Sequence, residues 1–104
     1  LLSAGRLTSL SYPQPYIEGE TALPIHGSAD FTLRGAQGAD ISFATYPEAG
    51  TYRCNVLLST DGSTCTLDLP SKVHTGTIHL IARASLPGES GCVRYARHVI
   101  TVAP

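Results

Sequence analysis

The sequence predicts an all-β fold, an immunoglobulin-like antiparallel β-sandwich of about seven strands. Short runs rich in Val, Ile, Leu, Thr, Tyr and Phe alternate along the whole chain with breaks made of Gly, Pro and Asp-Gly. No stretch keeps a helical period for three turns. Several short strands bounded by turn residues are typical of sandwiches and barrels, which act through exposed loops and edges.

The first half of the chain contains four predicted strands. They cover residues 7–12, 21–27, 30–33 and 40–46. The first strand ends where Pro13 and Pro15 remove backbone donors, and Pro24 inside the second predicts that one side of that strand is unpaired. A glycine-rich turn closes the third strand. The fourth alternates strictly, with Ile41 and Phe43 on one face, which is typical of a half-buried strand.

The second half contains a predicted hairpin and a closing pair of strands. These four strands cover residues 50–59, 63–69, 77–85 and 93–102. Asp61-Gly62 is the strongest hairpin signal in the sequence, and Pro70 ends the second arm. The third of these strands alternates, with Ile78 and Leu80 on one face. The fourth returns after a glycine-rich loop, so we expect the fold to end on a hairpin.

Length and composition bound the class of protein. The chain of 104 residues fits one domain, residues 1–104, and its lack of Met predicts that this domain belongs to a longer chain. A hydrophobic fraction of 42% with 14% charged residues is enough for a packed core. The net charge of −1 gives no basic surface for phosphates, so we expect no nucleic-acid partner. No apolar run reaches the ~20 residues that cross a bilayer, so we expect no membrane insertion by this domain.

Three cysteines, Cys54, Cys65 and Cys92, leave one thiol that is unpaired or bonded outside the domain. We predict a disulfide between Cys54 and Cys65, because the Asp-Gly turn between them returns the chain on itself. A tight turn there places Leu58 opposite Cys65, so the pair needs a longer loop or a bulge, and Cys92 remains an alternative partner of either. A disulfide indicates an oxidising compartment, which predicts an extracellular or cell-surface protein.

Cys92 stands at the exit of a loop, between Ser90-Gly91 and Val93. An exposed thiol at such a place would form an intermolecular disulfide. The other interpretation is a small buried residue at the start of the last strand, because free cysteines are often buried. Both interpretations stay open.

The segment 48–54, Glu-Ala-Gly-Thr-Tyr-Arg-Cys, resembles the strand F signature of true immunoglobulin domains, in which a tyrosine lies two residues before the second cysteine. No cysteine precedes Cys54, however, and the chain has no Trp for the core position of that family. We therefore interpret this match as coincidental.

A second resemblance covers more of the chain. Residues 10–13 and 18–31 are similar to the opening of an IPT/TIG domain, the immunoglobulin-like module found in plexins, in related receptors and beside some glycosidase catalytic domains. Residues 54–56, 61–70 and 76–80 are similar to that family's middle hairpin with its cysteine pair, the following Pro and the Gly-led strand after it. The resemblance implies an early-set sandwich that serves as a structural, dimerising or protein-binding module without catalytic residues.

No residue pattern indicates an enzyme, a metal or a cofactor. His74 and His79 would face opposite sides of one strand, whereas His79 and His98 would lie opposite each other on the last hairpin. We interpret these as ordinary surface histidines. Most carboxylates fall at turns, where they cap backbone groups, and no Gly-x-Ser-x-Gly motif is present.

The tyrosines offer a candidate binding surface. Tyr12 and Tyr16 flank the segment Pro-Gln-Pro, and aromatic residues are enriched at interface hot spots. These two residues are the predicted partner surface. For Tyr46 and Tyr52 we expect buried rings whose hydroxyls reach solvent or a backbone carbonyl.

Together these observations predict a non-catalytic structural or protein-binding module of a larger extracellular or cell-surface protein. An edge strand or the loop ends would present backbone donors and aromatic side chains to a protein partner or to a second copy. One alternative is an accessory or carbohydrate-binding β-domain of a carbohydrate-active enzyme, although the lack of Trp counts against a sugar site. Another is a capsid, tail or decoration module of a virus or phage.

Overall fold

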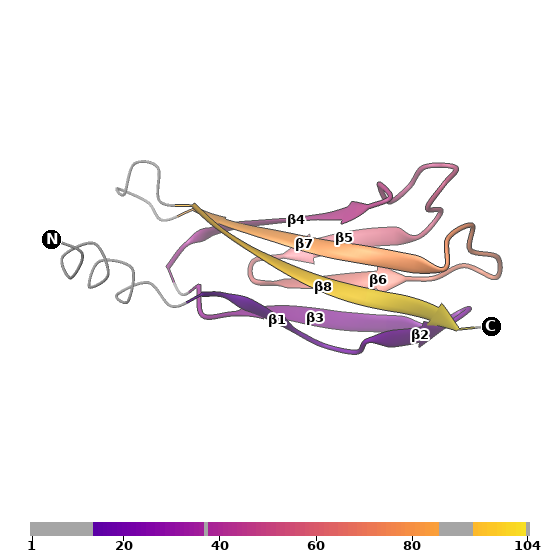
Figure 1. Cartoon of the computed structure of the whole chain (residues 1–104), viewed down its shortest axis with the longest axis horizontal. Helices are drawn as coiled ribbons and strands as arrows, with labels where there is room; N and C mark the ends of the chain where they lie inside the picture. Colours follow the sequence, from indigo (N-terminus) through magenta and orange to yellow (C-terminus); the bar gives the residue numbers. More distant parts are fainter. Residues whose placement is uncertain (1–13, 37, 86–92, 104) are drawn as a thin grey trace, which may run out of the picture.

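The computed structural model describes residues 14–36, 38–85 and 93–103, which form eight strands in two sheets and no helix (Figure 1). The strands are β1 (Tyr16–Glu18), β2 (Ala22–Pro24), β3 (Ser28–Arg34), β4 (Asp40–Tyr46), β5 (Leu57–Asp61), β6 (Thr64–Asp68), β7 (Thr77–Ser85) and β8 (Val93–Ala103). The first sheet has the order β1-β3-β6-β5 and the second has the order β2-β8-β7-β4. The predicted all-β sandwich is confirmed.

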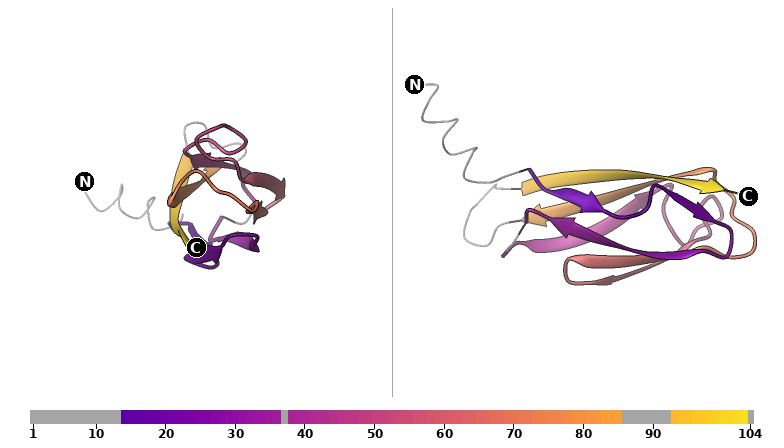
Figure 2. Two further views of the ribbon diagram at one scale, coloured as in Figure 1. Left: turned by 90° about the vertical axis from the view of Figure 1, so that its right-hand side faces the viewer. Right: turned by 90° about the horizontal axis from the view of Figure 1, so that it is seen from below.

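The strand order is that of an immunoglobulin-like sandwich. In constant-type immunoglobulin domains one sheet has the order A-B-E-D and the other contains C, F and G. With β3 as B, β4 as C and β7 as F, the first sheet reproduces A-B-E-D and the second reproduces G-F-C. The additional strand β2 joins the second sheet as a parallel partner of β8, whereas the other strand pairs are antiparallel. The two sheets lie face to face (Figure 2).

The core lies between the two sheets and is built by alternate residues of each strand. Every second residue of β7 is buried, from Ile78 to Ala84, and Phe31 of β3 is fully buried. The largest fully buried side chains are those of Phe31, Leu67, Ile78, Leu80, Ile100, Val56, Cys54 and Cys65. This alternation is the physical reason for the sandwich, since each sheet removes one apolar face from water by covering the other.

The strands agree with the sequence prediction best where the alternation is strict. β4 and β7 begin and end at the predicted residues, and β8 ends one residue later than predicted. β1 was not predicted, and the predicted strand 7–12 lies outside the described residues. β2 is shorter than predicted and is the edge strand of its sheet, as expected from Pro24.

The β5–β6 hairpin turns one residue later than the sequence predicted. Asp61 pairs with Thr64, so the two loop residues are Gly62 and Ser63 rather than Asp61 and Gly62. Gly62 has a φ of +62°, and a positive φ at the first loop position is that of a type II′ turn. The shift places Thr60 opposite Cys65 in the ladder.

Candidate functional site

The predicted disulfide between Cys54 and Cys65 is not formed. Both thiols are free and buried. The register of the hairpin gives the reason, because Thr60 lies opposite Cys65, while Cys54 precedes β5 and bonds back to Thr51 of its own loop. The extracellular expectation therefore loses the physical support that a disulfide would give.

Burial makes both thiols poor nucleophiles. It raises the pKa of Cys65 from the usual 9.0 to about 11, and the neighbouring carboxylate of Asp30 adds to the shift. Burial also raises the pKa of Cys54, partly offset by a backbone hydrogen bond at Val56. A thiolate is the reactive form of cysteine, so burial lowers the reactivity of both thiols.

This shift predicts a loss of stability at high pH. Between pH 9 and pH 11 the unfolded chain releases the proton of Cys65 while the folded chain keeps it, so the free energy of unfolding falls as pH rises. The expected loss is on the order of 2 kcal/mol. Urea unfolding at pH 8.5 and pH 11 measures it in the wild type and in Cys65→Ala. The variant should lose less over this interval, and equal losses would contradict the assignment.

Of the predicted partner surface, Tyr12 and Tyr16, the structure describes Tyr16. Tyr16 is exposed on the outer face of the first sheet, opposite Arg34, whose guanidinium pairs with Glu18 at 3.0 Å. Tyr12 and Cys92 lie outside the described residues. Tyr16 thus stands at an edge of the first sheet, separate from the aromatic residues described below.

The histidines do not form the predicted pair. Val99, not His98, lies opposite His79, so the two rings point to opposite faces of the second sheet. His98 faces inward, where its ring lies 5.5 Å from that of Phe31 and Nε2 bonds the carbonyl of Glu20 at 2.7 Å. Within the described residues, no group of three or more His, Cys, Asp or Glu side chains could hold a metal ion.

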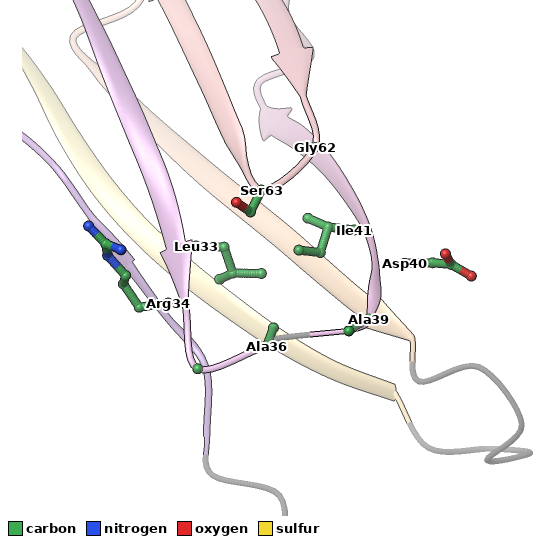
Figure 3. A pocket seen from close by; sticks show the side chains of 10 residues that line it. Leu33, Arg34, Ala36, Ala39, Asp40, Ile41, Gly62 and Ser63 are labelled. Carbon is green, nitrogen blue, oxygen red and sulfur yellow. The ribbon is translucent and has the colours of Figure 1, made fainter.

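One end of the sandwich carries an open hollow of about 630 Å³, between the β3–β4 connection and the β5–β6 turn (Figure 3). Leu33 and Ile41 form its apolar floor, whereas the charged ends of Arg34 and Asp40 point away from it. Ser63 supplies the one side-chain hydroxyl among the lining residues. Among the described lining residues, the Ser63 hydroxyl is therefore the one uncharged side-chain polar group, and the two charged groups do not converge on it.

The outer face of the second sheet has a different character. Its exposed side chains come from β4, β7 and β8, and we call this surface the aromatic face. Its members are Tyr46, His79, Ile81, Arg83, Tyr95, Arg97 and Val99, and the same outer face also includes Asp40, Ser42, Ala44, Thr77, Ser85 and Thr101. Tyr46 is 64% exposed, Tyr95 57% and Val99 41%.

The ladder register orders these residues in three rows across the sheet. One row is Tyr46, His79 and Val99, in which the first two rings lie 6.4 Å apart. In the next row Ile81 lies opposite Arg97, and in the third Arg83 lies opposite Tyr95. The aromatic face thus combines rings, aliphatic side chains and two guanidinium groups on one rigid sheet.

The ring of His79 is the most embedded polar group of this face. Its Nδ1 is buried and has no hydrogen-bond partner. Leaving a buried polar atom unbonded costs free energy, and groups of this kind recur at functional positions. This observation singles out the row of Tyr46 and His79, at one end of the aromatic face.

The outer face of the first sheet is polar and acidic by comparison. Its outward residues are Tyr16, Glu18, Ser28, Asp30, Thr32, Arg34, Leu57, Ser59, Asp61, Thr64, Thr66 and Asp68. Four carboxylates stand there against one guanidinium, and small hydroxyl side chains fill the centre. Such a surface is typical of solvated sheet, so the two faces of the sandwich differ in both charge and apolar content.

The expectation that Tyr46 and Tyr52 bury their rings is wrong. Tyr46 occupies an outward position of β4, and Tyr52 is 84% exposed in the β4–β5 loop. There its ring stacks on His74 at 5.1 Å, while Asn55 bonds the backbone of Lys72 and accepts from the His74 amide at 3.0 Å. The segment 48–54, which resembled strand F of immunoglobulin domains, is therefore part of a loop. This agrees with the interpretation of that match as coincidental.

Comparisons with known proteins add a fold neighbour. No family model matches the sequence, and no curated protein matches it. Among solved structures, the chain is similar to a nucleoside hydrolase-related hypothetical protein from Saccharophagus degradans that is associated with carbohydrate metabolism, with a TM-score of 0.51 and 16% identity. The match covers 88% of this chain and 26% of the other, so the chain spans about a quarter of that protein. None of the described residues forms a helix able to cross a membrane. The similarity to this solved structure shows the fold alone.

Proposed function

We propose that the chain is a non-catalytic β-sandwich module that binds a protein partner through its aromatic face. The observation that carries this proposal is the asymmetry between the two sheets. Tyr46, Tyr95 and Val99 are exposed together on one face, while the opposite outer face is mostly polar and acidic and exposes Tyr16 and Leu57 only on its two edge strands. Exposed apolar side chains that are clustered on one surface mark interaction sites more often than scattered ones do.

The residue types favour a protein partner. Tyrosine and arginine are the side chains enriched at the energetic centres of protein interfaces, and the aromatic face contains both. A rigid sheet holds them at fixed spacing, which lowers the entropy that binding must overcome. Arg83 and Arg97 give the face a positive charge, so the complementary surface would be acidic.

A role as one module of a larger protein is supported by the fold neighbour, in which a similar sandwich forms 26% of the chain. The sequence resemblance to IPT/TIG domains supports the same role. The second candidate is a carbohydrate ligand, which the neighbour's association with carbohydrate metabolism favours. In that case the rings of Tyr46 and Tyr95 would stack on the sugar.

Photo-crosslinking tests the proposal. Benzoylphenylalanine replaces Tyr95 in the full-length parent protein, and a matched variant carries it at Tyr16, which is equally exposed on the other sheet. We expect crosslinks to one protein from Tyr95 and none to that protein from Tyr16. Equal crosslinking from both positions would contradict the proposal.

Affinity measurements with the captured partner extend this test. Tyr95→Ala and Arg97→Ala should each weaken binding about tenfold or more, because hot-spot truncations cost about 2 kcal/mol. Tyr16→Ala should leave the affinity unchanged. Binding of an oligosaccharide that is lost in Tyr46→Ala, with no protein captured, would establish the second candidate instead.

A further inference from the structure

Strand β4 is an edge strand without the usual protection. It pairs with β7 at all seven of its residues, from Asp40 to Tyr46, so no bulge interrupts it, and no strand of the described residues lies on its other side. Between its two end residues it contains no charged side chain and no proline. An edge of this kind offers a row of unpaired backbone donors and acceptors to another strand.

The other edges of the sandwich are protected. β1 and β2 have three residues each, and β2 contains Pro24. β5 has five residues, fewer than the seven of β4. Short length, proline and charge are the features that prevent pairing at an edge. The contrast singles out β4, the longest of the four edge strands (Figure 1).

An apolar groove runs beside this edge. It has a volume of about 370 Å³ and lies between β4 and the start of β5. Phe43, Val56 and Leu58 are among its lining residues, and Leu57 at its rim is 67% exposed. A strand added to β4 would direct every second side chain toward this groove, because side chains alternate across a strand.

We propose that a second copy of this chain binds here, with the two β4 strands paired antiparallel about a two-fold axis at Phe43. This register pairs all seven residues of the strand with those of its copy. On the inner face Phe43 meets Phe43, and Ile41 meets Thr45, so each copy supplies the apolar side chains that the other's groove accepts. On the outer face the small residues Ser42 and Ala44 oppose each other, so nothing obstructs the approach of the backbones.

Charge complementarity favours the second copy as the occupant. In the proposed register Asp40 of one copy reaches the Tyr46 end of the other. Arg53 lines the hollow beside Tyr46 there and is exposed. Within the described residues the one salt bridge is between Arg34 and Glu18, which leaves Asp40 and Arg53 free to pair. The two-fold axis repeats the contact, giving two complementary pairs per dimer.

The size of the contact sets its strength. One strand pair with its flanking side chains buries less than the ~1,200 Å² of a stable interface. The dimer is therefore concentration-dependent, and several copies held in one assembly would favour it through a high effective concentration. This inference uses the β4 edge and does not depend on the partner of the aromatic face.

Sedimentation over a range of protein concentrations tests the dimer. The 10.9 kDa chain should shift reversibly toward twice that mass. The double variant Ser42→Lys, Ala44→Lys should remain a monomer over the same range, since lysine on an edge repels a second edge. Ala22→Lys, which places one lysine on β2 at the opposite edge, should dimerise like the wild type, and so should Thr21→Lys at the exposed residue before β2. Circular dichroism verifies that each variant is folded.

Cysteine crosslinking tests the register. In a Cys92→Ser background, Ser42→Cys and Ala44→Cys variants are mixed under mild oxidation. The proposed pairing brings residue 42 of one copy opposite residue 44 of the other, within the reach of a disulfide, whereas either variant alone pairs only diagonally. We expect several-fold more crosslinked dimer in the mixture than in either variant.

Two results would overturn the inference. One is a wild-type chain that remains a monomer at millimolar concentration, and the other is crosslinking that is equal in the mixture and in the single variants. Tyr95→Ala separates this inference from the proposed function. It should dimerise normally even though it loses the partner of the aromatic face, and failure of the partner experiments would leave the sedimentation result unchanged.

Discussion

Phe31→Ala should lower the free energy of unfolding by about 3–5 kcal/mol, the largest effect of a single side-chain truncation in this chain. Phe31 is fully buried in β3, opposite Cys65 of β6. Its ring lies 5.5 Å from that of His98 on the other sheet, so it bridges the two layers. Truncation leaves a cavity that the two sheets cannot close without moving together, and this adds to the lost transfer free energy.

Urea unfolding monitored by circular dichroism measures this effect, with Phe43→Ala as the matched control. Phe43 has the same side chain but is half-buried at the edge of the second sheet. Its truncation should cost about 1–2 kcal/mol, because water reaches the space that it leaves. Both variants are compared at low concentration, where the β4 edge is unpaired. Equal losses would mean that Phe31 does not form the centre of the core.

The sequence predicted correctly those strands in which the alternation of apolar and polar residues within the strand shows which side chains are buried. In β4 and β7 the apolar residues recur at every second position, so the pattern alone predicts the strand and its buried face. β1 escaped prediction because its three residues carry one buried side chain, Ile17, which is too little for a periodic signal. Pairing with β3 makes it a strand.

Registers were predicted less well, since a shift of one residue reverses which face a side chain occupies. Because the hairpin turns at Gly62-Ser63 instead of Asp61-Gly62, the residue opposite Cys65 is Thr60 and not the expected Leu58. In the last hairpin the partner of His79 is Val99 instead of His98, a difference of one residue that places His98 inside the sandwich and His79 outside it. Turn residues identify a hairpin, but the fit of the two core faces decides its register.

The aromatic face could be predicted in part. Tyr46 falls on the face of β4 opposite to Ile41 and Phe43, so the alternation already indicated that its ring is exposed. Tyr95 joins it only through β7, which pairs with both β4 and β8. These strands are far apart in the sequence, and their adjacency is a property of the sheet order. The alternation of β4 thus contained a signal for the exposed ring of Tyr46, which the expectation of a buried ring did not use, whereas the surface that Tyr46 and Tyr95 share follows only from the sheet order.

Gly19→Ala should lower the free energy of unfolding by about 1–3 kcal/mol, although Gly19 is itself exposed. A Cβ added to Gly19 would collide with Cδ1 of Phe31 and would lie 2.9 Å from Cε1. The ring is held on all sides in the core and cannot yield to a clash of this size. Gly76→Ala is the matched control, because an added Cβ there meets nothing within 4 Å. It should be neutral or slightly stabilising, since alanine restricts the unfolded chain.

A double-mutant cycle identifies the cause of the Gly19 effect. Phe31→Leu removes ring atoms that the new Cβ would strike, so it should cost less in the Gly19→Ala background than in the wild type. A backbone effect at Gly19 would instead add to the cost of Phe31→Leu without coupling. Phe31 belongs to β3, and Gly19 to the segment that follows β1. If the two substitutions together cost less than the sum of their separate effects, the core side chain of Phe31 fixes the exposed turn at Gly19.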